Sequence, residues 1–218
     1  MAARPALEAE LRQIGESVIE MGTLIESTIS TAIRSLREGD VEAARALIAN
    51  DQQIDDMEDE INELCLAFLA TQSPLAGDLR YVISIMKVIR DLERIGDHCE
   101  DIAKYTLRFE NEAMFKDLID ISRMADRSSR MVKNAIDAFV HRDLRLARHV
   151  WKDDEEVDEL FRDLFDELIE TADTDPKHAK QCIMLLFIAA HLERIADYAT
   201  NICEETVFVL EGSIEMEL

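Results

Sequence analysis

Glycine, proline and aromatic residues are scarce in this chain. Its 218 residues include only six glycines and three prolines, and aromatic side chains make up 6% of the total. Glycine and proline interrupt regular structure and aromatic residues favour strands, so their scarcity argues against a protein rich in tight turns and β-sheet. Ala, Leu, Ile, Glu, Asp and Arg dominate instead, a composition that favours long helices. We expect an all-α protein.

Cysteine pairs and long apolar segments are also missing. The four cysteines, Cys65, Cys99, Cys182 and Cys203, form no CxxC pair and read as reduced thiols. The N-terminal MAARPALEAE has no hydrophobic signal core, and the longest apolar run, Cys182–Ala190, is far shorter than the ~20 residues that cross a bilayer. We therefore expect a cytoplasmic protein with no direct membrane insertion.

Positive charge is in short supply. The chain has 24 Lys and Arg against 47 Asp and Glu, for a formal net charge of -23. Nucleic acids and anionic membranes are themselves polyanions, so the chain is not expected to bind either of them. Cations and basic protein surfaces are the more suitable partners.

Apolar and small side chains recur at spacings of three and four residues in both halves of the chain. This spacing lines them along one helix face and is typical of the seam of a helical bundle. In the first half these residues are Leu7, Leu11, Ile14, Val18, Met21, Ile25, Thr28 and Ala32. In the second half they are Leu118, Ile121, Ala125, Ser128, Val132, Ala135 and Phe139.

The periodic segments and the breaks between them predict six long helices. A serine or aspartate followed by proline supplies an N-cap and a first-turn proline, and glycine ends a helix. The expected boundaries are Gly39 for the first helix, Asp40 to about Ala70 for the second, Ser73–Pro74 to about Phe109 for the third, a break at His141–Asp143, and Asp175–Pro176 to Gly212 for the last.

The two halves also match residue by residue. Leu92–Asp97 reads LERIGD and Leu192–Asp197 reads LERIAD, 100 residues further on. The preceding helices correspond at a separation of 103 residues, with Asp40, Arg45, Asp51 and Asp55 matching Asp143, Arg148, Asp154 and Asp158. A repeat of this length is too long for a solenoid unit and indicates duplication of a helical subdomain. We predict two tandem three-helix bundles, at residues 1–110 and 111–218.

Acidic pairs spaced four residues apart occur on two helices of each half. A pair at this spacing repels itself on a single helix, and packing two pairs together increases the cost, which a bound cation would reverse. Carboxylates without thiolates favour hard or borderline ions, so iron, manganese, magnesium and zinc are all admissible. The pairs are Asp51 with Asp55, Glu93 with Asp97, Asp154 with Asp158, and Glu193 with Asp197.

Plainer interpretations of these acids stay open. Asp and Glu on helices usually form a solvated face, and Arg94 and Arg194 sit beside the acids and would neutralise them if they formed ion pairs. No histidine has the Glu-x-x-His spacing of di-iron bundles, which favours a half-exposed polar role for His98 and a core role for His191. The chain also lacks phosphate-loop, Gly-x-Ser-x-Gly and Cys-His motifs, so it is not expected to be an enzyme.

The repeated LERIGDHCEDI and LERIADYATNI, the DLR at Asp78–Arg80 and the six-helix duplication resemble the PhoU family. This resemblance implies a cytoplasmic pair of three-helix bundles whose E/D-x-x-x-D motifs hold multinuclear metal clusters. The two repeats of the motif differ at two positions, which puts equal metal loading of the halves in question. Gly96 corresponds to Ala196, and Asp101 corresponds to Asn201. Carried onto this sequence, the implied ligands are Asp51, Asp55, Glu93 and Asp97 in one cluster, Asp154, Asp158, Glu193 and Asp197 in the other, and Asp101 and Asn201 as additional candidates.

The same resemblance implies a function. Members of the family regulate phosphate uptake and repress the phosphate-starvation response, so the expected partners are the ATPase subunit of the phosphate ABC transporter and a sensor histidine kinase. The expected cofactors are metal ions, iron or zinc foremost, then manganese or magnesium, and a homodimer is a further expectation. The competing hypotheses are a carboxylate-bridged metal-dependent enzyme or metal store, and a helical scaffold without metal.

Overall fold

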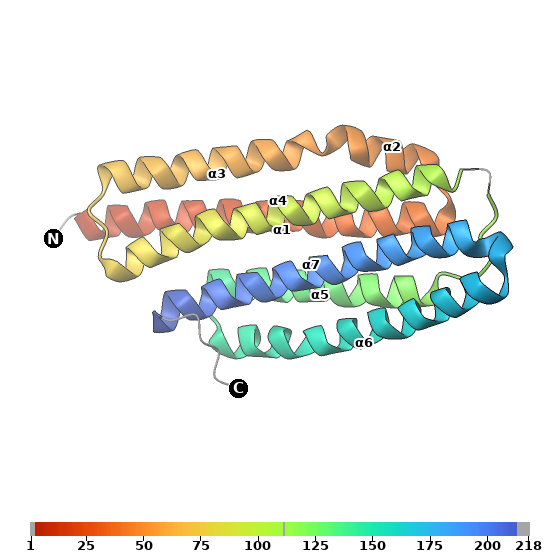
Figure 1. Cartoon of the computed structure of the whole chain (residues 1–218). Helices are drawn as coiled ribbons and strands as arrows, with labels where there is room; N and C mark the ends of the chain where they lie inside the picture. The colour runs from red at the N-terminus through yellow and green to blue at the C-terminus, as the bar shows by residue number, and fades with distance from the viewer. Residues whose placement is uncertain (1–2, 111, 213–218) are drawn as a thin grey trace.

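The computed structural model describes residues 3–110 and 112–212, and helices account for nearly all of them (Figure 1). No strand occurs in these residues. The all-α prediction is confirmed. In chain order the elements are α1 (Ala3–Glu38), α2 (Val41–Asn50), α3 (Gln52–Thr71), α4 (Ala76–Arg108), α5 (Ile119–His141), α6 (Leu144–Thr174), the short 3-10 helix η1 (Pro176–His178) and α7 (Ala179–Glu211).

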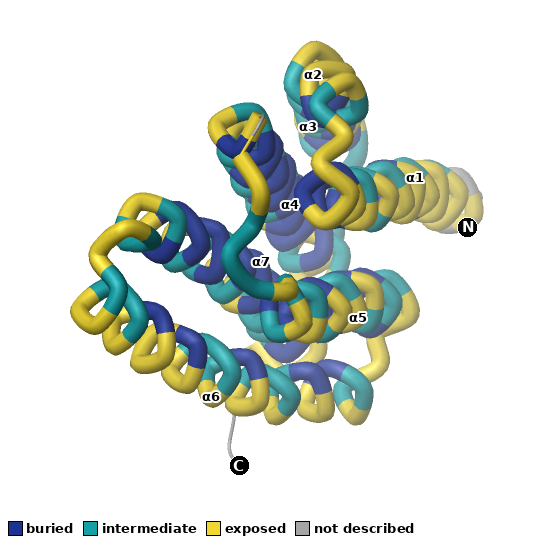
Figure 2. The backbone as a smooth tube through the Cα atoms, turned by 90° about the vertical axis from the view of Figure 1, so that its right-hand side faces the viewer, coloured by how far each residue is buried: buried dark blue, intermediate teal, exposed yellow. Residues whose placement is uncertain are grey.

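The helices form two bundles that lie side by side. The first consists of α1, the α2–α3 rod and α4, and the second of α5, α6 and α7 (Figure 1). The bundles meet where α4 packs on α7 and α1 packs on α5. Viewed along the helices, the buried faces turn inward toward this seam and the exposed faces turn outward (Figure 2). The predicted pair of three-helix bundles is therefore present.

Buried hydrophobic side chains from every α-helix form one contiguous cluster. The two bundles thus share a core, and division of the chain at residue 110 stays a prediction, with residues 1–2, 111 and 213–218 of the predicted units lying outside the described residues. All four cysteines are free and buried in this core. Across the described residues, no helix combines the length and apolar character needed to span a membrane.

The first helix of each half ends in the same way. Gly39 after α1 and Arg142 after α5 both have a positive φ, of 65° and 54°. The next residue, Asp40 or Asp143, then caps the following helix by accepting a hydrogen bond from a backbone N–H. Arg142 tolerates the left-handed conformation while its guanidinium lies 4.5 Å over the ring of Tyr81.

Three predicted helix boundaries are wrong in detail. The second helix is interrupted at Asp51, where the Ile54 N–H bonds to the Asp51 carbonyl three residues back instead of four. Asn and Asp have low helix propensity, yet α6 continues through the matching positions, so propensity is not the only cause. The N-cap of α4 is Leu75 rather than Ser73, and Pro176 opens η1 rather than α7 itself.

Candidate functional site

The first carboxylate quartet, Asp51, Asp55, Glu93 and Asp97, lies between the α2–α3 rod and α4. Asp51 stands at the junction of α2 and α3, and Asp55 follows one turn later. The negative charges of Asp55 and Asp97 act on Asp51, and those of Asp97 and Asp55 act on Glu93. The structure therefore brings the two acidic pairs of this half together, while their role as metal ligands stays a prediction.

Burial and mutual repulsion raise the pKa values in the first quartet. Burial raises the pKa of Asp51 to about 6, and Glu100, Asp55 and Asp97 add to the shift. Burial raises the pKa of Glu93 to about 7, with further contributions from Asp97 and Glu58. The pKa of Asp97 is raised by the same causes. These shifts identify a cluster of negative charge that neighbouring cations do not offset.

The second quartet, Asp154, Asp158, Glu193 and Asp197, repeats the arrangement between α6 and α7. Burial raises the pKa of Asp154 to about 6, and the charges of Asp158 and Asp197 add to the shift. The pKa values of Glu193 and Asp197 are raised as well, by burial first and then by acidic neighbours within the quartet. The duplication visible in the sequence is thus also a duplication of an acidic cluster.

The two repeated arginines, Arg94 and Arg194, do not form ion pairs with the carboxylates of the quartets. Within the part of the chain that the structure describes, neither Arg94 nor Arg194 lies within 4.0 Å of a carboxylate oxygen of the quartets. Arg94 instead lies 5.8 Å over the ring of Tyr198, on the opposite side of the seam between the bundles. Both arginines lower nearby carboxyl pKa values, but the net shift stays upward. The ion-pair alternative is therefore not what this structure contains.

The carboxylates of the quartets are the kind of ligand that hard or borderline cations prefer. Their oxygen atoms, however, lie too far apart to contact a single ion without side-chain movement. A zinc ion bound at about 2.0–2.2 Å needs its oxygen ligands within about 4.4 Å of one another. Among residues 3–110 and 112–212, one group of three His, Cys, Asp or Glu side chains has ligand atoms that all lie within 4.8 Å of one another. That group contains no residue of either quartet.

That one group consists of His98, Asp101 and His191, which the sequence did not connect. The Nδ1 atoms of His98 and His191 lie 3.0 Å apart, and the Asp101 carboxylate faces His191 from the adjacent turn of α4. The repeat aligns His191 with Asp91, so comparison of the halves hides this contact. Antiparallel pairing of the two LERI helices would have revealed it. Asn201, the other additional candidate, is half-buried on α7.

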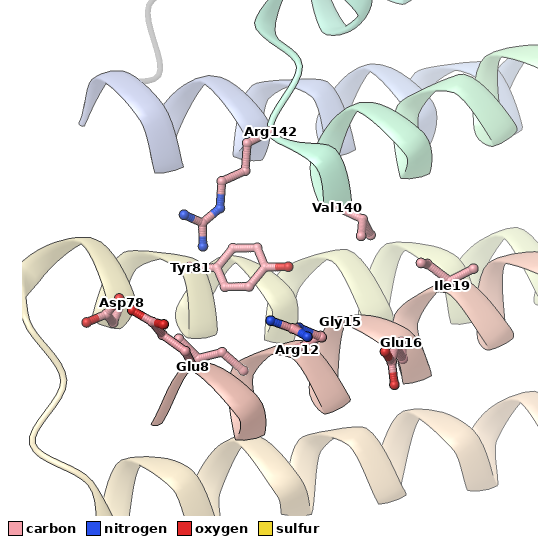
Figure 3. Close-up of a pocket in the computed structure, with 10 residues that line it drawn as sticks. Glu8, Arg12, Gly15, Glu16, Ile19, Asp78, Tyr81, Val140 and Arg142 are labelled. Carbon is pink, nitrogen blue, oxygen red and sulfur yellow. The ribbon is translucent and has the colours of Figure 1, made fainter. Parts of the chain in front are cut away.

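A separate cleft of about 490 Å³ lies between α1, α4 and α5 (Figure 3). Tyr81 forms its floor, where it stacks on Phe139 with ring centroids 5.4 Å apart and lies beneath Arg142. Figure 3 shows Arg12 from α1 and Arg142 from the turn after α5 on either side of this ring, with acidic side chains close by. The lining mixes both signs of charge and includes no quartet residue, so the cleft is independent of the acidic clusters.

Comparison with known proteins assigns the chain to a family. The model of the PhoU domain matches it twice, over residues 18–106 and again over residues 121–206. The chain belongs to the PhoU family. Each match contains one complete quartet, and together the two PhoU domains account for most of the chain.

Relatives align over almost their whole length. Proteins described as phosphate-specific transport system accessory protein PhoU homologues are 35% identical over 96% of both chains in Clostridium acetobutylicum, and 37% identical in Aquifex aeolicus over 94% of this chain and 93% of the relative. The crystal structure of PhoU from Pseudomonas aeruginosa superimposes with a TM-score of 0.90 at 32% identity, covering 94% of this chain and 99% of that one. The corresponding structure from Streptococcus pneumoniae gives 0.91 at 31%, covering 97% and 100%. The PhoU-like fold predicted from the sequence is confirmed.

Packing accounts for one departure between the two PhoU repeats. A Cβ added at Gly96 would lie 2.8 Å from Ile54 Cδ1, so alanine at this position requires the end of the Ile54 side chain to shift. The corresponding residues of the second repeat are Ala196 and the shorter Val157, both fully buried. The larger helix residue thus accompanies a smaller neighbour, and each acidic quartet is held over an interface of similar total volume.

Proposed function

We propose that this chain is an accessory regulator of phosphate transport that works through contacts with other proteins. The observation that carries the proposal is the PhoU match in both halves, with aligned relatives of nearly equal length described as accessory proteins of the phosphate-specific transport system. Its partners are the ATPase subunit of the phosphate ABC transporter and a sensor histidine kinase. Through them it represses the phosphate-starvation response when phosphate is plentiful.

The surface and composition of the chain support such contacts. The net charge of -23 suits basic protein surfaces better than nucleic acid or anionic lipid. The long helices present extended exposed faces on the outside of both bundles (Figure 2). The proposal places the chain in the cytoplasm, beside an ATPase subunit, and assigns it no catalytic residue.

We further propose that both quartets hold metal ions, iron or zinc foremost, then manganese or magnesium. Asp51 and Asp55 would bind from the α2–α3 rod and Glu93 and Asp97 from α4, with the matching four residues in the second half. A bound cation supplies positive charge that offsets repulsion between these carboxylates. The residues themselves would then hold the outer rod of each bundle against the helix that forms the seam.

Deletion of the gene tests the regulatory role. In phosphate-rich medium the deletion should raise phosphate uptake or phosphatase expression, and the intact gene supplied in trans should restore repression. Co-purification of the ATPase subunit with the tagged chain tests direct contact. A deletion strain with normal uptake and normal phosphatase expression in that medium would contradict the regulatory assignment.

Elemental analysis tests the metal assignment separately. The purified chain should contain iron, zinc or manganese, and Glu93→Ala or Asp97→Ala should lower the content while leaving helical circular dichroism unchanged. Unchanged metal content in both variants would remove the quartets as ligands. The metal-store alternative makes a different prediction, because a store takes up many more ions per chain than eight carboxylates in two clusters hold.

A further inference from the structure

Two histidines from opposite halves of the chain meet at the seam between the bundles. His98 lies on α4 and His191 on α7, and these helices run antiparallel (Figure 1). The Nδ1 atoms are 3.0 Å apart and the ring centroids 5.2 Å apart. Asp101, one turn after His98, places its Oδ2 atom 4.0 Å from Nε2 of His191. His191 thus faces His98 with Nδ1 and Asp101 with Nε2, so two imidazoles and a carboxylate from two bundles meet around one ring.

The three groups lie close enough that small side-chain rotations would bring one ligand atom of each onto a single metal ion. One ring nitrogen from each histidine and one oxygen of Asp101 all lie within 4.8 Å of one another. A tetrahedral zinc ion holds nitrogen ligands at about 2.0–2.1 Å, which separates two ligand atoms by about 3.3 Å. The 3.0 Å between the two Nδ1 atoms is close to that value.

Each imidazole can offer one ring nitrogen to a metal ion. Both side chains are partly buried against aromatic neighbours, since Tyr198 stacks on His98 and Tyr105 lies beside His191. Neutral imidazole offers a nitrogen lone pair, whereas the protonated ring does not.

The Asp101 carboxylate is also held in an orientation that suits a metal ligand. Oδ1 accepts a hydrogen bond from Lys104 Nζ at 3.1 Å, which leaves Oδ2 directed toward His191. A ligand carboxylate anchored in this way by a second group is typical of metal sites. Lys104 and Arg194 also place positive charge near the group, and Glu100 offsets part of it through its own ion pair with Lys104.

We propose that His98, Asp101 and His191 bind one borderline divalent transition-metal ion, represented by Zn²⁺, and that this ion links α4 to α7. Imidazole ligands favour such ions over Mg²⁺ and Ca²⁺, so the site differs in preference from the all-carboxylate quartets. The repeat counterparts of the three ligands are Tyr198, Asn201 and Asp91. The duplication therefore supplies no second copy, and the chain holds one such ion.

Nitrogen NMR of the metal-stripped full chain, labelled in its histidine side chains, tests the proposal directly. With Asp55→Asn and Asp158→Asn introduced so that the quartets do not compete, one equivalent of Zn²⁺ should shift the ring signals of His98 and His191 and leave His141, His149 and His178 unchanged. His149 is the internal control because its side chain is 68% exposed on α6. Unshifted signals for the seam pair, or an equal shift at His149, would overturn the site.

Variants extend the test to binding and stability. His191→Gln and Asp101→Asn should each lose one equivalent of Zn²⁺ in equilibrium dialysis and abolish the Zn²⁺-dependent rise in thermal midpoint, whereas His149→Gln should keep both. Asp101→Asn keeps the size of the side chain, so it still tests the site if the His191→Gln variant fails to fold. Asp55→Asn with Asp158→Asn disables the quartets and should leave the seam ion bound. Retention of the seam equivalent in both ligand variants would overturn the proposal without touching the quartets.

Discussion

Glu93 shows how burial and like charge make a single carboxylate costly when no cation is bound. Its folded pKa, about 7, lies above the unfolded value of 4.5, so its contribution favours the folded state below about pH 4.5 and is lost as pH rises through 7. Glu93→Gln should therefore stabilise the metal-free chain at pH 8, by about 0.5 kcal/mol from relieved repulsion. At pH 5 the variant and the wild type should be nearly equal.

Urea unfolding in the presence of a chelator measures this difference. Comparing the two chains at each pH cancels the opposite effect of His98, whose lowered pKa removes stability as pH falls below 6.5. Glu26→Gln on α1 is a suitable control, since Glu26 lies outside the quartets and pairs with Lys133 across the seam. A Glu93→Gln variant less stable than wild type at pH 8 would contradict the charge argument.

The contact between Gly96 and Ile54 makes a second prediction about single residues. Gly96→Ala brings a Cβ to 2.8 Å from Ile54 Cδ1, while the second repeat accepts alanine beside valine. We expect Gly96→Ala to be more favourable in an Ile54→Val background than in the wild type by about 1 kcal/mol. A double-mutant cycle from urea unfolding gives this coupling directly. Additive effects would mean that Ile54 moves aside freely.

The residues that pattern analysis predicted best are those whose partners lie within one repeat. Asp51, Asp55, Glu93 and Asp97 are two i, i+4 pairs on neighbouring helices, and the recurrence of both pairs indicated that they belong together. His98 and His191 were missed because their contact depends on how one bundle docks on the other. The repeat compares equivalent positions, whereas the antiparallel seam brings non-equivalent positions together.

Some helix ends are set by the local sequence and could be predicted, whereas others are set by tertiary contacts and could not. The stops at Gly39 and Gly212 were predictable because each residue has the positive φ that glycine adopts without strain. Arg142 takes the place of such a glycine in the second half, and its position over Tyr81 is a tertiary contact that no local pattern contains. The interruption at Asp51 was likewise missed, because α6 remains helical through the matching positions and no local signal separates the two halves there.

The N-cap of α6 provides a prediction about a whole helix. Asp143 accepts hydrogen bonds from the backbone N–H groups of Arg145 and Leu146, at 2.9 and 3.0 Å. Asp143→Ala should destabilise the chain by about 1 kcal/mol, and Asp143→Ser by less, since serine also caps. Thermal and urea unfolding of the two variants would measure the loss. Equal destabilisation by alanine and serine would show that the cap bonds are not its cause.

The whole molecule is a pair of similar bundles, with α4 packed antiparallel on its own counterpart α7. Equivalent places on the two sides of the seam hold different chemistry. On one side Tyr105 stacks on Phe187 with centroids 5.9 Å apart. On the other side the matching residues are Glu205 and Lys87, joined by an ion pair of 2.7 Å. Duplication thus conserved the scaffold while the contacts between the halves diverged, and the histidine site is one product of that divergence.

Exchange of one seam contact for the other tests this view of the molecule. Glu205 is only 8% exposed and also accepts a bond of 2.7 Å from the buried Ser84 hydroxyl, so Glu205→Ala leaves Ser84 and Lys87 without their partner. Because Lys87 is half exposed, the expected cost is about 1–2 kcal/mol, below that of a fully buried pair. The double variant Lys87→Phe with Glu205→Tyr installs the aromatic pair of the other side and should recover part of this loss. If the double variant were as unstable as the sum of its two single changes, the two sides of the seam would not be interchangeable.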